Sequence, residues 1–541
     1  MHTFAVVPIA VNAGAAALPA IVAAAASLAA IVLKPRALIQ LVQRRKLAFL
    51  FAFAALVTLT GAGYRWHARS TSVRAARNGN AQQSRIDWAK VAEDIIAQEK
   101  LSQASSLPVS STPAEPASIA ANAPKEIAPA VVESSPAATQ DFCRAQYKGG
   151  PSPAGLTPAW SYKPEGTLFL GTPAMAGRRL YVAGCQSDLG GYTGLFACLD
   201  LDTGKPVWEM TQAGSEPLRP FFSSPAVSAD GKYVLIGQGL HQDRDCSLLC
   251  FEAATGRQVW AVKTALHIES SPAIYGAIAV VGAGAIEGAD GKAAGDPGFV
   301  FGVRITDGKL LWKQPVNDPE SSPAIDENGM VYIGSGCNGQ AVVAIRSASD
   351  ADLEQKKLER VAWRTSVAYP MLAPVTLASN LVIAAGGNGD MVHSGQNPQG
   401  VVVALNREDG KVLWQTKLED AVLGAVAFQD GRLVCPVRNG EVAALAISDG
   451  HILWRARVSG NAPVLCGCAV TRDRAYALSN DGYLAALAIA DGKVLEKLYL
   501  NDQSQTGTGL SISSPQVFDN RILVGSETGG LRCLQGSGGA K

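Results

Sequence analysis

The chain has 541 residues, of which 48% are hydrophobic and 17% are charged, so it is long enough for one large domain with additional segments. Its formal net charge of +1 gives no reason to expect a nucleic acid partner. The clearest basic cluster lies near the N-terminus between two apolar runs, and this context indicates a membrane.

The two apolar runs differ in strength. Residues 1–33 form a weak apolar segment with prolines and many alanines, whereas residues 47–64 are richer in Leu and Phe. We predict a transmembrane helix at 47–64. The sequence does not decide whether the segment at 1–33 also crosses the membrane. The stretch KPRALIQLVQRRK between them carries basic residues and no acid, so we expect it to remain in the cytoplasm.

This orientation predicts a membrane-anchored protein of the bacterial inner-membrane type, whose main domain is extracytoplasmic, that is, periplasmic. A cleaved signal peptide is the alternative. Residues 84–101 carry Trp88, Val91 and Ile95 at helical spacing, which predicts a short amphipathic helix. Residues 102–141 are rich in Ala, Pro and Ser, which predicts a disordered linker.

A repeat occupies most of residues 142–541, and DLDTGKPVW, which ends at Trp208, is its clearest copy. Each copy is typical of a strand, a tight turn containing glycine, and a second strand. A small residue precedes each turn glycine by six positions, and we expect it to face the neighbouring sheet. The copies end at Trp208, Trp260, Trp312, Trp363, Trp414, Trp454 and Glu496, between 40 and 52 residues apart.

That spacing predicts one four-stranded propeller blade for each copy. An eighth unit begins at Ser513, but the chain ends before its fourth strand. An isolated segment near the start of the repeats, PAWSYKPEG with Trp160, could supply that strand. We therefore predict an all-β fold, an eight-bladed β-propeller at 142–541 closed by this upstream segment, which leaves no open sheet edge.

Repeats of the form Ala-x-Asp-x-x-Thr-Gly-Lys-x-x-Trp resemble the tryptophan-docking motif of PQQ-like propellers, and the resemblance covers residues 158–535. Two families share that fold, the quinoprotein dehydrogenases and the outer-membrane assembly lipoprotein BamB. Resemblance to the dehydrogenases implies PQQ, a calcium ion held by carboxylate and amide side chains, and a catalytic Asp. Resemblance to BamB implies only the ring and an envelope location, although a membrane helix is predicted here where that family has a lipid anchor.

The BamB resemblance is the stronger of the two. The adjacent cysteine pair that forms a disulfide against PQQ in the dehydrogenases has no counterpart, and the nearest pattern is Cys466-Gly467-Cys468. A Cys-x-x-Cys-His haem site is also absent from the sequence. None of the dehydrogenases' functional residues can be placed on this chain, so we assign no catalytic residue and expect no cofactor.

Long loops indicate where a ligand or partner binds. Four connections between second and third strands are long, GCQSDLGGYTG, GLHQDRDC, EGADGKAAGDPG and GNGDMVHSGQNPQG, and in a propeller they share one rim. Candidate residues on this rim are Asp188, Tyr192, His241, Asp243, Arg244, His267, Glu269, Asp290, Asn388, Asp390 and His393.

The rim residues allow two interpretations. His241, Asp243 and Arg244, with His267 and Glu269 in the next connector, could hold a metal or polar ligand, but solvated loop charges are commoner, and we assign no metal. Asp290 lies in a glycine-rich loop that lacks the spacing of a known calcium motif.

Two smaller patterns complete the sequence. Ser-Ser-Pro precedes several predicted inner strands, first at 223–225, and the serines are expected to satisfy backbone groups or to bind a solute. The insertion at 347–360 falls between third and fourth strands, which predicts a short solvated helix on the opposite face.

Two classes of function remain. The favoured one is a non-catalytic scaffold, tethered to a membrane through its N-terminal helix, that binds a protein or envelope polymer through the loop-rich rim. The alternative is a PQQ- and calcium-dependent oxidoreductase. Neither involves a nucleic acid.

Overall fold

The computed structural model describes residues 152–188, 191–286, 295–337, 339–504 and 509–537. The predicted membrane segments at 1–33 and 47–64, the helix at 84–101 and the linker at 102–141 lie outside these residues. Within the described residues, no helix combines the length and the apolar character needed to cross a membrane.

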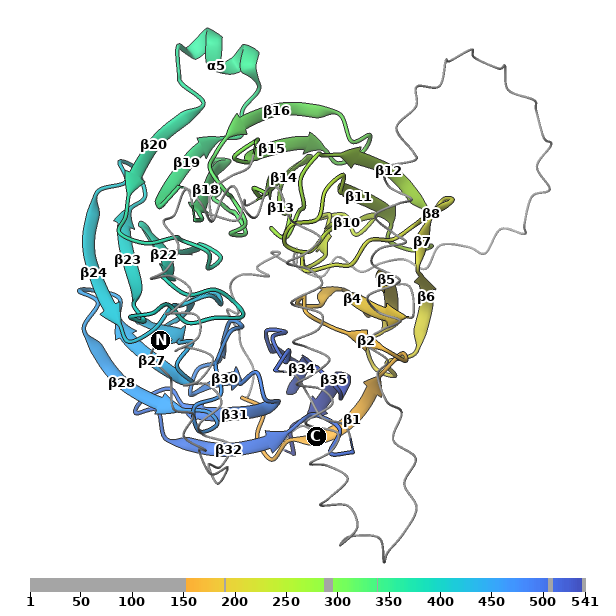
Figure 1. The fold of residues 1–541 in the computed structure, drawn as a ribbon, viewed down its shortest axis with the longest axis vertical. Helices are drawn as coiled ribbons and strands as arrows, with labels where there is room; N and C mark the ends of the chain where they lie inside the picture. Colours follow the sequence, from red (N-terminus) through yellow and green to blue (C-terminus); the bar gives the residue numbers. More distant parts are fainter. Residues whose placement is uncertain (1–151, 189–190, 287–294, 338, 505–508, 538–541) are drawn as a thin grey trace, which may run out of the picture. The chain divides into compact units, whose positions relative to one another are not determined.

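The described residues form eight antiparallel sheets arranged around a central axis (Figure 1). This confirms the predicted eight-bladed β-propeller. Blade 1 contains β2 (Thr167–Leu168), β3 (Ala174–Ala176), β4 (Arg179–Asp188), β5 (Gly191–Asp200) and β6 (Pro206–Met210). Blade 2 contains β9 (Ala226–Val227), β10 (Tyr233–Gly237), β11 (Ser247–Glu252) and β12 (Gln258–Lys263). Blade 3 contains β13 (Ala273–Tyr275), β14 (Ile278–Ala283), β15 (Phe299–Arg304) and β16 (Leu310–Pro315).

The ring continues with the same order of strands from the axis outward. Blade 4 contains β17 (Ala324–Ile325), β18 (Met330–Ser335), β19 (Ala341–Arg346) and β20 (Val361–Ser366). Blade 5 contains β21 (Thr376–Ala378), β22 (Leu381–Gly387), β23 (Gly400–Asn406) and β24 (Val412–Leu418). Blade 6 contains β25 (Ala427–Gln429), β26 (Arg432–Pro436), β27 (Glu441–Ala446) and β28 (Ile452–Arg457).

The last two blades contain the end of the chain. Blade 7 contains β29 (Ala469–Val470), β30 (Arg474–Leu478), β31 (Tyr483–Ala488) and β32 (Val494–Tyr499). Blade 8 contains β33 (Gln516–Phe518), β34 (Arg521–Ser526), β35 (Gly530–Gln535) and β1 (Thr157–Tyr162). A short ribbon of β7 (Gln212–Ala213) and β8 (Glu216–Pro217) follows blade 1.

The hydrophobic core lies between the blades. The middle strands, such as β11, are buried almost throughout, whereas an outer strand such as β20 alternates between half-buried and exposed residues. One apolar cluster joins Leu180 and Val182 of blade 1 to Leu523 and Leu531 of blade 8, and comparable clusters join the other neighbouring blades. Each blade is therefore stabilised by burial against its two neighbours.

The tryptophans dock onto the next blade. The indole N–H of Trp260 donates to the carbonyl of Ile305 at 2.7 Å, and its ring lies against the turn glycine Gly308, where a Cβ would come within 2.7 Å of the indole. The small residues before the turns face the neighbouring blade, as predicted: Cys250 of blade 2 lies in one apolar cluster with Val281 and Phe301 of blade 3, and its thiol lies 3.9 Å from the Ile305 carbonyl oxygen. The same position also pairs directly with the tryptophan of its own blade, as Gly302 does with Trp312, where a Cβ would lie 2.5 Å from the indole ring.

Blade 8 is closed as the sequence predicted. Strand β1 pairs with β35 in antiparallel register, with Thr157 opposite Gln535 and Tyr162 opposite Leu531. Trp160 therefore takes the fourth-strand position, opposite Cys533, and donates to the carbonyl of Leu201 in blade 1 at 3.2 Å.

The structure also explains why blade 7 ends in Glu496 instead of tryptophan. Blade 8 has no turn between its third and fourth strands, because its fourth strand comes from upstream in the chain. The residues just before β1 fill that place, and their N–H groups donate to the Glu496 carboxylate, from Gly155 at 3.0 Å and from Leu156 at 2.7 Å.

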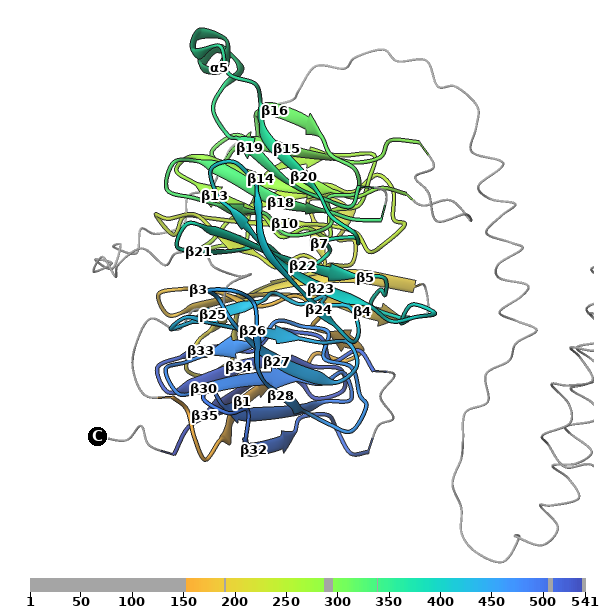
Figure 2. The same ribbon diagram turned by 90° about the vertical axis from the view of Figure 1, so that its left-hand side faces the viewer.

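The two faces of the ring are built from different connections, because the strands of each blade are antiparallel. One face, here called the loop face, carries the connections from second to third strands and those that lead to the next blade. The other, the turn face, carries the glycine turns between third and fourth strands. The predicted insertion is helix α5 (Asp350–Lys356), which lies between β19 and β20 and projects beyond the sheets (Figures 1 and 2).

Candidate functional site

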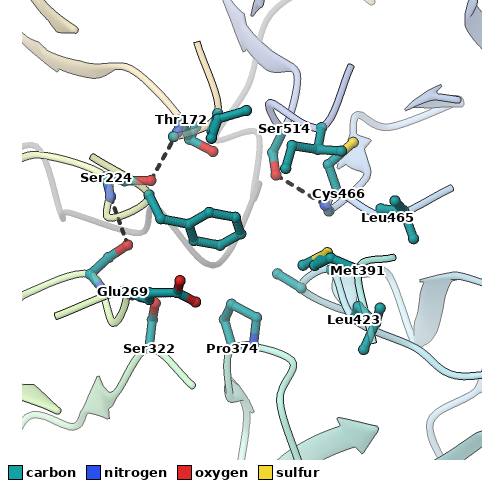
Figure 3. A pocket seen from close by; sticks show the side chains of 18 of the residues that line it. Thr172, Ser224, Glu269, Ser322, Pro374, Met391, Leu423, Leu465, Cys466 and Ser514 are labelled. Atoms are coloured by element: carbon teal, nitrogen blue, oxygen red, sulfur yellow. Dashed lines mark hydrogen bonds between the residues drawn. The ribbon is translucent and has the colours of Figure 1, made fainter. Parts of the chain in front are cut away.

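A cavity of about 110 Å³ lies at the centre of the ring, where the segments leading to the innermost strands converge (Figure 3). Every blade contributes a short segment to its wall. The first position of these segments is occupied by Leu170, Phe222, Glu269, Glu320, Leu372, Leu423, Leu465 and Ile512. The position two residues later is occupied by Thr172, Ser224, Ser271, Ser322, Pro374, Ala425, Gly467 and Ser514.

The second serine of each Ser-Ser-Pro segment links neighbouring blades. The backbone N–H of Thr172 donates to Ser224 Oγ at 2.8 Å, and the N–H of Ser224 donates to Ser271 Oγ at 2.9 Å (Figure 3). Ser271 N–H continues the series to Ser322 Oγ at 2.9 Å. These hydroxyls therefore satisfy buried backbone groups, which is the structural interpretation of the motif.

The first serine of the motif serves the same purpose. Ser270 Oγ donates to the carbonyl of Ser321 at 3.0 Å, and Ser321 Oγ donates to the carbonyl of Ala373 at 2.9 Å. Ser513 Oγ donates across the closing junction to the carbonyl of Gly171 at 3.1 Å. The hydroxyls around the cavity are thus used in holding the ring together.

Two carboxylates interrupt an otherwise apolar first position. Glu269 and Glu320 come from adjacent blades, and the Glu269 side chain points toward the cavity (Figure 3). Within the described residues, neither carboxylate forms an ion pair with Lys or Arg; the ion-pair partners of Glu320 are histidines. Two acidic groups in a largely apolar wall require compensation from something other than a lysine or arginine.

Two histidines converge on Glu320. Nδ1 of His241, in the loop between β10 and β11, lies 2.9 Å from Glu320 Oε1. Nε2 of His267, in the connection between β12 and β13, lies 2.8 Å from the same oxygen. The side chain of His267 is completely buried, that of Glu320 is 13% exposed, and that of His241 is 44% exposed. The cluster thus extends from a buried position to solvent on the loop face.

The charges of the cluster shift its titration. Burial raises the pKa of Glu269 well above its usual value, and the negative charge of Glu320 raises it further. Burial opposes ionisation of Glu320, but hydrogen bonds from His241 and His267 hold its pKa below the usual value. Burial also lowers the pKa of His267, but its hydrogen bond with Glu320 and the negative charges of Glu320 and Glu269 together outweigh that effect and raise this pKa. Glu320 is therefore the stable anion of the group.

The structure brings His241, His267 and Glu269 together as the candidate residues suggested, and adds Glu320, which the sequence reasoning missed. A signal for Glu320 existed, because it precedes Ser321-Ser322-Pro323 just as Glu269 precedes the preceding copy of that motif. Two other candidates shape the loop instead. The Asp243 carboxylate accepts from Leu240 N–H at 2.9 Å, and the backbone of Arg244 bridges to Leu266.

The candidates in the loop between β22 and β23 lie apart from the cluster. Asn388 and Asp390 accept backbone N–H groups of their own loop, Asn388 from Gln399 and Asp390 from Val392 and His393. The side chain of His393 is 80% exposed. The residue of this loop that reaches the cavity wall is Met391, which was not a candidate.

The remaining candidates are in or beside other loops. Tyr192, in β5, is 60% exposed on the loop face. Asp188 is the last residue of β4, and Asp290 lies outside the described residues.

The cavity does not fit PQQ. Its volume is well below the range of about 300–1,000 Å³ that is usual for cofactor and drug-sized ligands. PQQ is a tricarboxylate, yet the described lining residues include two glutamates and neither lysine nor arginine. The clustered donors beside the cavity are mainly imidazole nitrogens, whereas calcium prefers six to eight oxygen ligands.

The proteins that this chain resembles match it over the propeller residues. A family model described as "Outer membrane protein assembly factor BamB" matches residues 157–393 and 398–541. BamB of Burkholderia pseudomallei is 26% identical over 276 residues, which are 48% of this chain and 62% of that protein. The quinoprotein alcohol dehydrogenase PedH of Pseudomonas putida is 27% identical over 275 residues, which are 48% of this chain and 41% of that protein. The matches thus span less than two thirds of these relatives.

Solved structures show the same ring. BamB from Moraxella catarrhalis aligns with a TM-score of 0.52 at 15% identity, over 72% of this chain and 100% of that one. A europium-containing methanol dehydrogenase aligns with a TM-score of 0.51 at 15% identity, over 69% of this chain and 85% of that one. At these identities the likeness concerns the fold alone.

Proposed function

Since the chain belongs to the family described as outer membrane protein assembly factor BamB, we propose that it is a non-catalytic scaffold whose loop face binds a protein partner or an envelope polymer. In this proposal the N-terminal segments anchor the chain in a bacterial-type inner membrane and the propeller lies on the periplasmic side.

The observation that carries the proposal is the asymmetry of the ring. Connections between second and third strands are long in blades 2, 3 and 5 but tight in blades 6 to 8, although the blades share one architecture. In blade 1 the long connection expected from the sequence is instead a longer hairpin, because the additional residues extend β4 and β5 to ten residues each. Blade packing does not require this difference, and additional loop length on one face of a rigid scaffold is typical of binding surfaces.

Exposed apolar side chains on the loop face support a protein partner. Tyr192, near the start of β5, is 60% exposed, and Val392, in the long connection between β22 and β23, is 73% exposed. Aromatic and aliphatic side chains of this kind provide the buried anchors of protein interfaces. Most polar groups of the β22–β23 loop are bonded within that loop, which holds Val392 at the surface.

The test is capture of membrane proteins by chemical crosslinking with the full chain and with a double variant, Tyr192→Ser with Val392→Ser. The expected result is loss of the crosslinked partner in the double variant. A matched control, Leu310→Ser with Leu413→Ser, removes apolar side chains of 50% and 53% exposure from outer strands and should leave the partner in place. Equal loss in both variants, or no loss in the first, would refute the choice of face.

The similarity to PedH supports a second candidate, a PQQ- and calcium-dependent oxidoreductase. Adding PQQ and calcium to the purified chain tests it directly. A bound-quinone absorption spectrum accompanied by reduction of a dye acceptor would overturn the scaffold proposal. We expect neither, because the described cavity wall opposes a tricarboxylate.

A further inference from the structure

We propose that His241, His267 and Glu320 bind a divalent transition-metal ion of the zinc class on the loop face, beside the central cavity. The proposal is independent of the partner-binding function, and nothing in the scaffold role requires it.

The ligand atoms are already gathered. One nitrogen from each imidazole and one carboxylate oxygen all lie within 4.8 Å of one another. The two nitrogens lie 2.8 and 2.9 Å from Glu320 Oε1, whereas ligands of a tetrahedral zinc ion are about 3.3 Å apart, given bonds of about 2.0 Å. Binding therefore requires a separation of about half an ångström, which the solvent-exposed His241 can provide.

The backbone leaves room for this group. Gly284, just after β14, lies against both buried ligands, and a Cβ there would come within 2.6 Å of His267 Nε2 and 3.0 Å of Glu320 Oε1. Its φ is not in the left-handed region, so conformational freedom does not explain the glycine. The glycine is instead explained by the space that its missing side chain leaves beside the ligand atoms.

The burial of His267 is a second, independent indication. Its side chain is completely buried, yet its Nδ1 has no hydrogen-bond partner among the described residues. A buried polar atom without a partner is uncommon in folded proteins and asks for an explanation. Among the described residues the hydrogen bonding of this buried imidazole is therefore made through Nε2, the nitrogen that lies beside Glu320 and would coordinate the ion.

Charge points the same way. Glu269 and Glu320 place two carboxylates beside the cavity, and no Lys or Arg within the described part of the chain forms an ion pair with either. A divalent ion on Glu320 would supply the missing positive charge.

The donor set selects the class of ion. Imidazole nitrogens suit zinc, copper, nickel and similar ions, whereas magnesium and calcium prefer sites made of oxygen. Three protein ligands leave one tetrahedral position for water or for a group from a bound molecule. His241, at 44% exposure, lies on the path by which the ion would enter from solvent.

Calorimetric titration of the chelator-treated full chain with zinc chloride tests the proposal. The expected result is one zinc ion per chain, with His241→Ala lowering the affinity by at least about 10- to 100-fold, since even loss of a second-sphere contact has effects of that size. Glu320→Gln should have a similar effect. His393→Ala is the matched control, because this exposed histidine also neighbours an aspartate on the loop face and should leave binding unchanged.

A second measurement identifies the ligands and does not depend on the stability of the variants. Cobalt substituted for zinc should give the visible absorption bands of a tetrahedral site, and His241→Ala should abolish them while the circular dichroism of the protein stays unchanged. Absence of zinc binding by the parent chain, equal affinity of His241→Ala, or displacement of zinc by equimolar calcium would overturn the proposal.

Discussion

The turn face and the loop face of the ring are made by the same strands but obey different rules. On the turn face, seven tryptophans donate their indole N–H groups to carbonyls of the next blade, from Trp160 to Trp454, at 2.7 to 3.2 Å. On the loop face the connections differ from blade to blade, and the two carboxylates of the cavity wall come from neighbouring blades. Tryptophan docking is thus spread around the ring, whereas the charged groups of the cavity wall are concentrated in one sector.

This difference predicts the largest loss of stability for a turn-face tryptophan. Trp312 is 3% exposed and donates to the carbonyl of Ser347 at 3.1 Å, so Trp312→Ala should lower the free energy of unfolding by about 3–5 kcal/mol. Urea unfolding followed by circular dichroism measures it. Leu310→Ala, at a half-exposed position two residues earlier, should change it by about 0.5 kcal/mol or less. A cost below about 1 kcal/mol for Trp312→Ala would show that docking is not what holds the blades together.

An intermediate loss of stability is expected in blade 7, which has Glu496 where the other blades have a docking tryptophan. Glu496→Ala removes the acceptor of Gly155 and Leu156 and leaves the N–H of the buried Leu156 unsatisfied, which should cost about 1–3 kcal/mol. Glu496→Gln keeps one acceptor oxygen and should cost less. Glu496→Trp restores the repeat but should also destabilise, because blade 8 has no turn glycine to receive the ring. Stabilisation by Glu496→Trp in a melting experiment would contradict this explanation.

An effect of opposite sign is expected on the loop face. Burial and the Glu320 charge raise the pKa of Glu269 in the folded state, so its contribution to stability is complete below the unfolded pKa of about 4.3 and is lost as pH rises toward the raised pKa. Glu269→Gln cannot ionise, so in metal-free buffer its melting temperature should exceed that of the parent by an increasing margin from pH 5 to 8. A margin that shrinks with pH would show that the Glu269 carboxylate is stabilised in the fold.

The regularity of the turn face is why the fold could be predicted from sequence. The glycine turn followed by a tryptophan, as at Trp208, recurs once in each unit and predicted the blades. The isolated segment around Trp160 predicted the closing strand that pairs with β35. The orientation of the small residues toward the next blade was also predicted, as Cys250 shows. The sequence pattern did not show that the indole ring nearest such a position, for example Gly302, belongs to the tryptophan opposite it in the same hairpin.

The loop face was less predictable, because its contacts join residues far apart in sequence. His241 and Glu320 lie 79 residues apart, and their meeting follows from the curvature of the ring. Charged residues in a loop also have two possible uses that composition does not distinguish. Both residues lie in long polar loops, but the Asp390 carboxylate accepts a hydrogen bond from His393 N–H in its own loop, whereas the His241 side chain contacts Glu320, which comes from another blade. Comparing the repeats position by position would have identified Glu320 beside Glu269.

The closure of blade 8 has a consequence for how the protein is made. Thr157 and Gln535 lie 378 residues apart in sequence, so β1 leaves the ribosome long before its partner strand exists. At about 5 to 20 residues per second, synthesis of the intervening chain takes on the order of 20 to 75 seconds. During that time β1 has no partner strand, and the face of blade 1 that packs against blade 8 is uncovered. Folding in the cell therefore requires that this first strand be shielded from other nascent chains until the last one is synthesised.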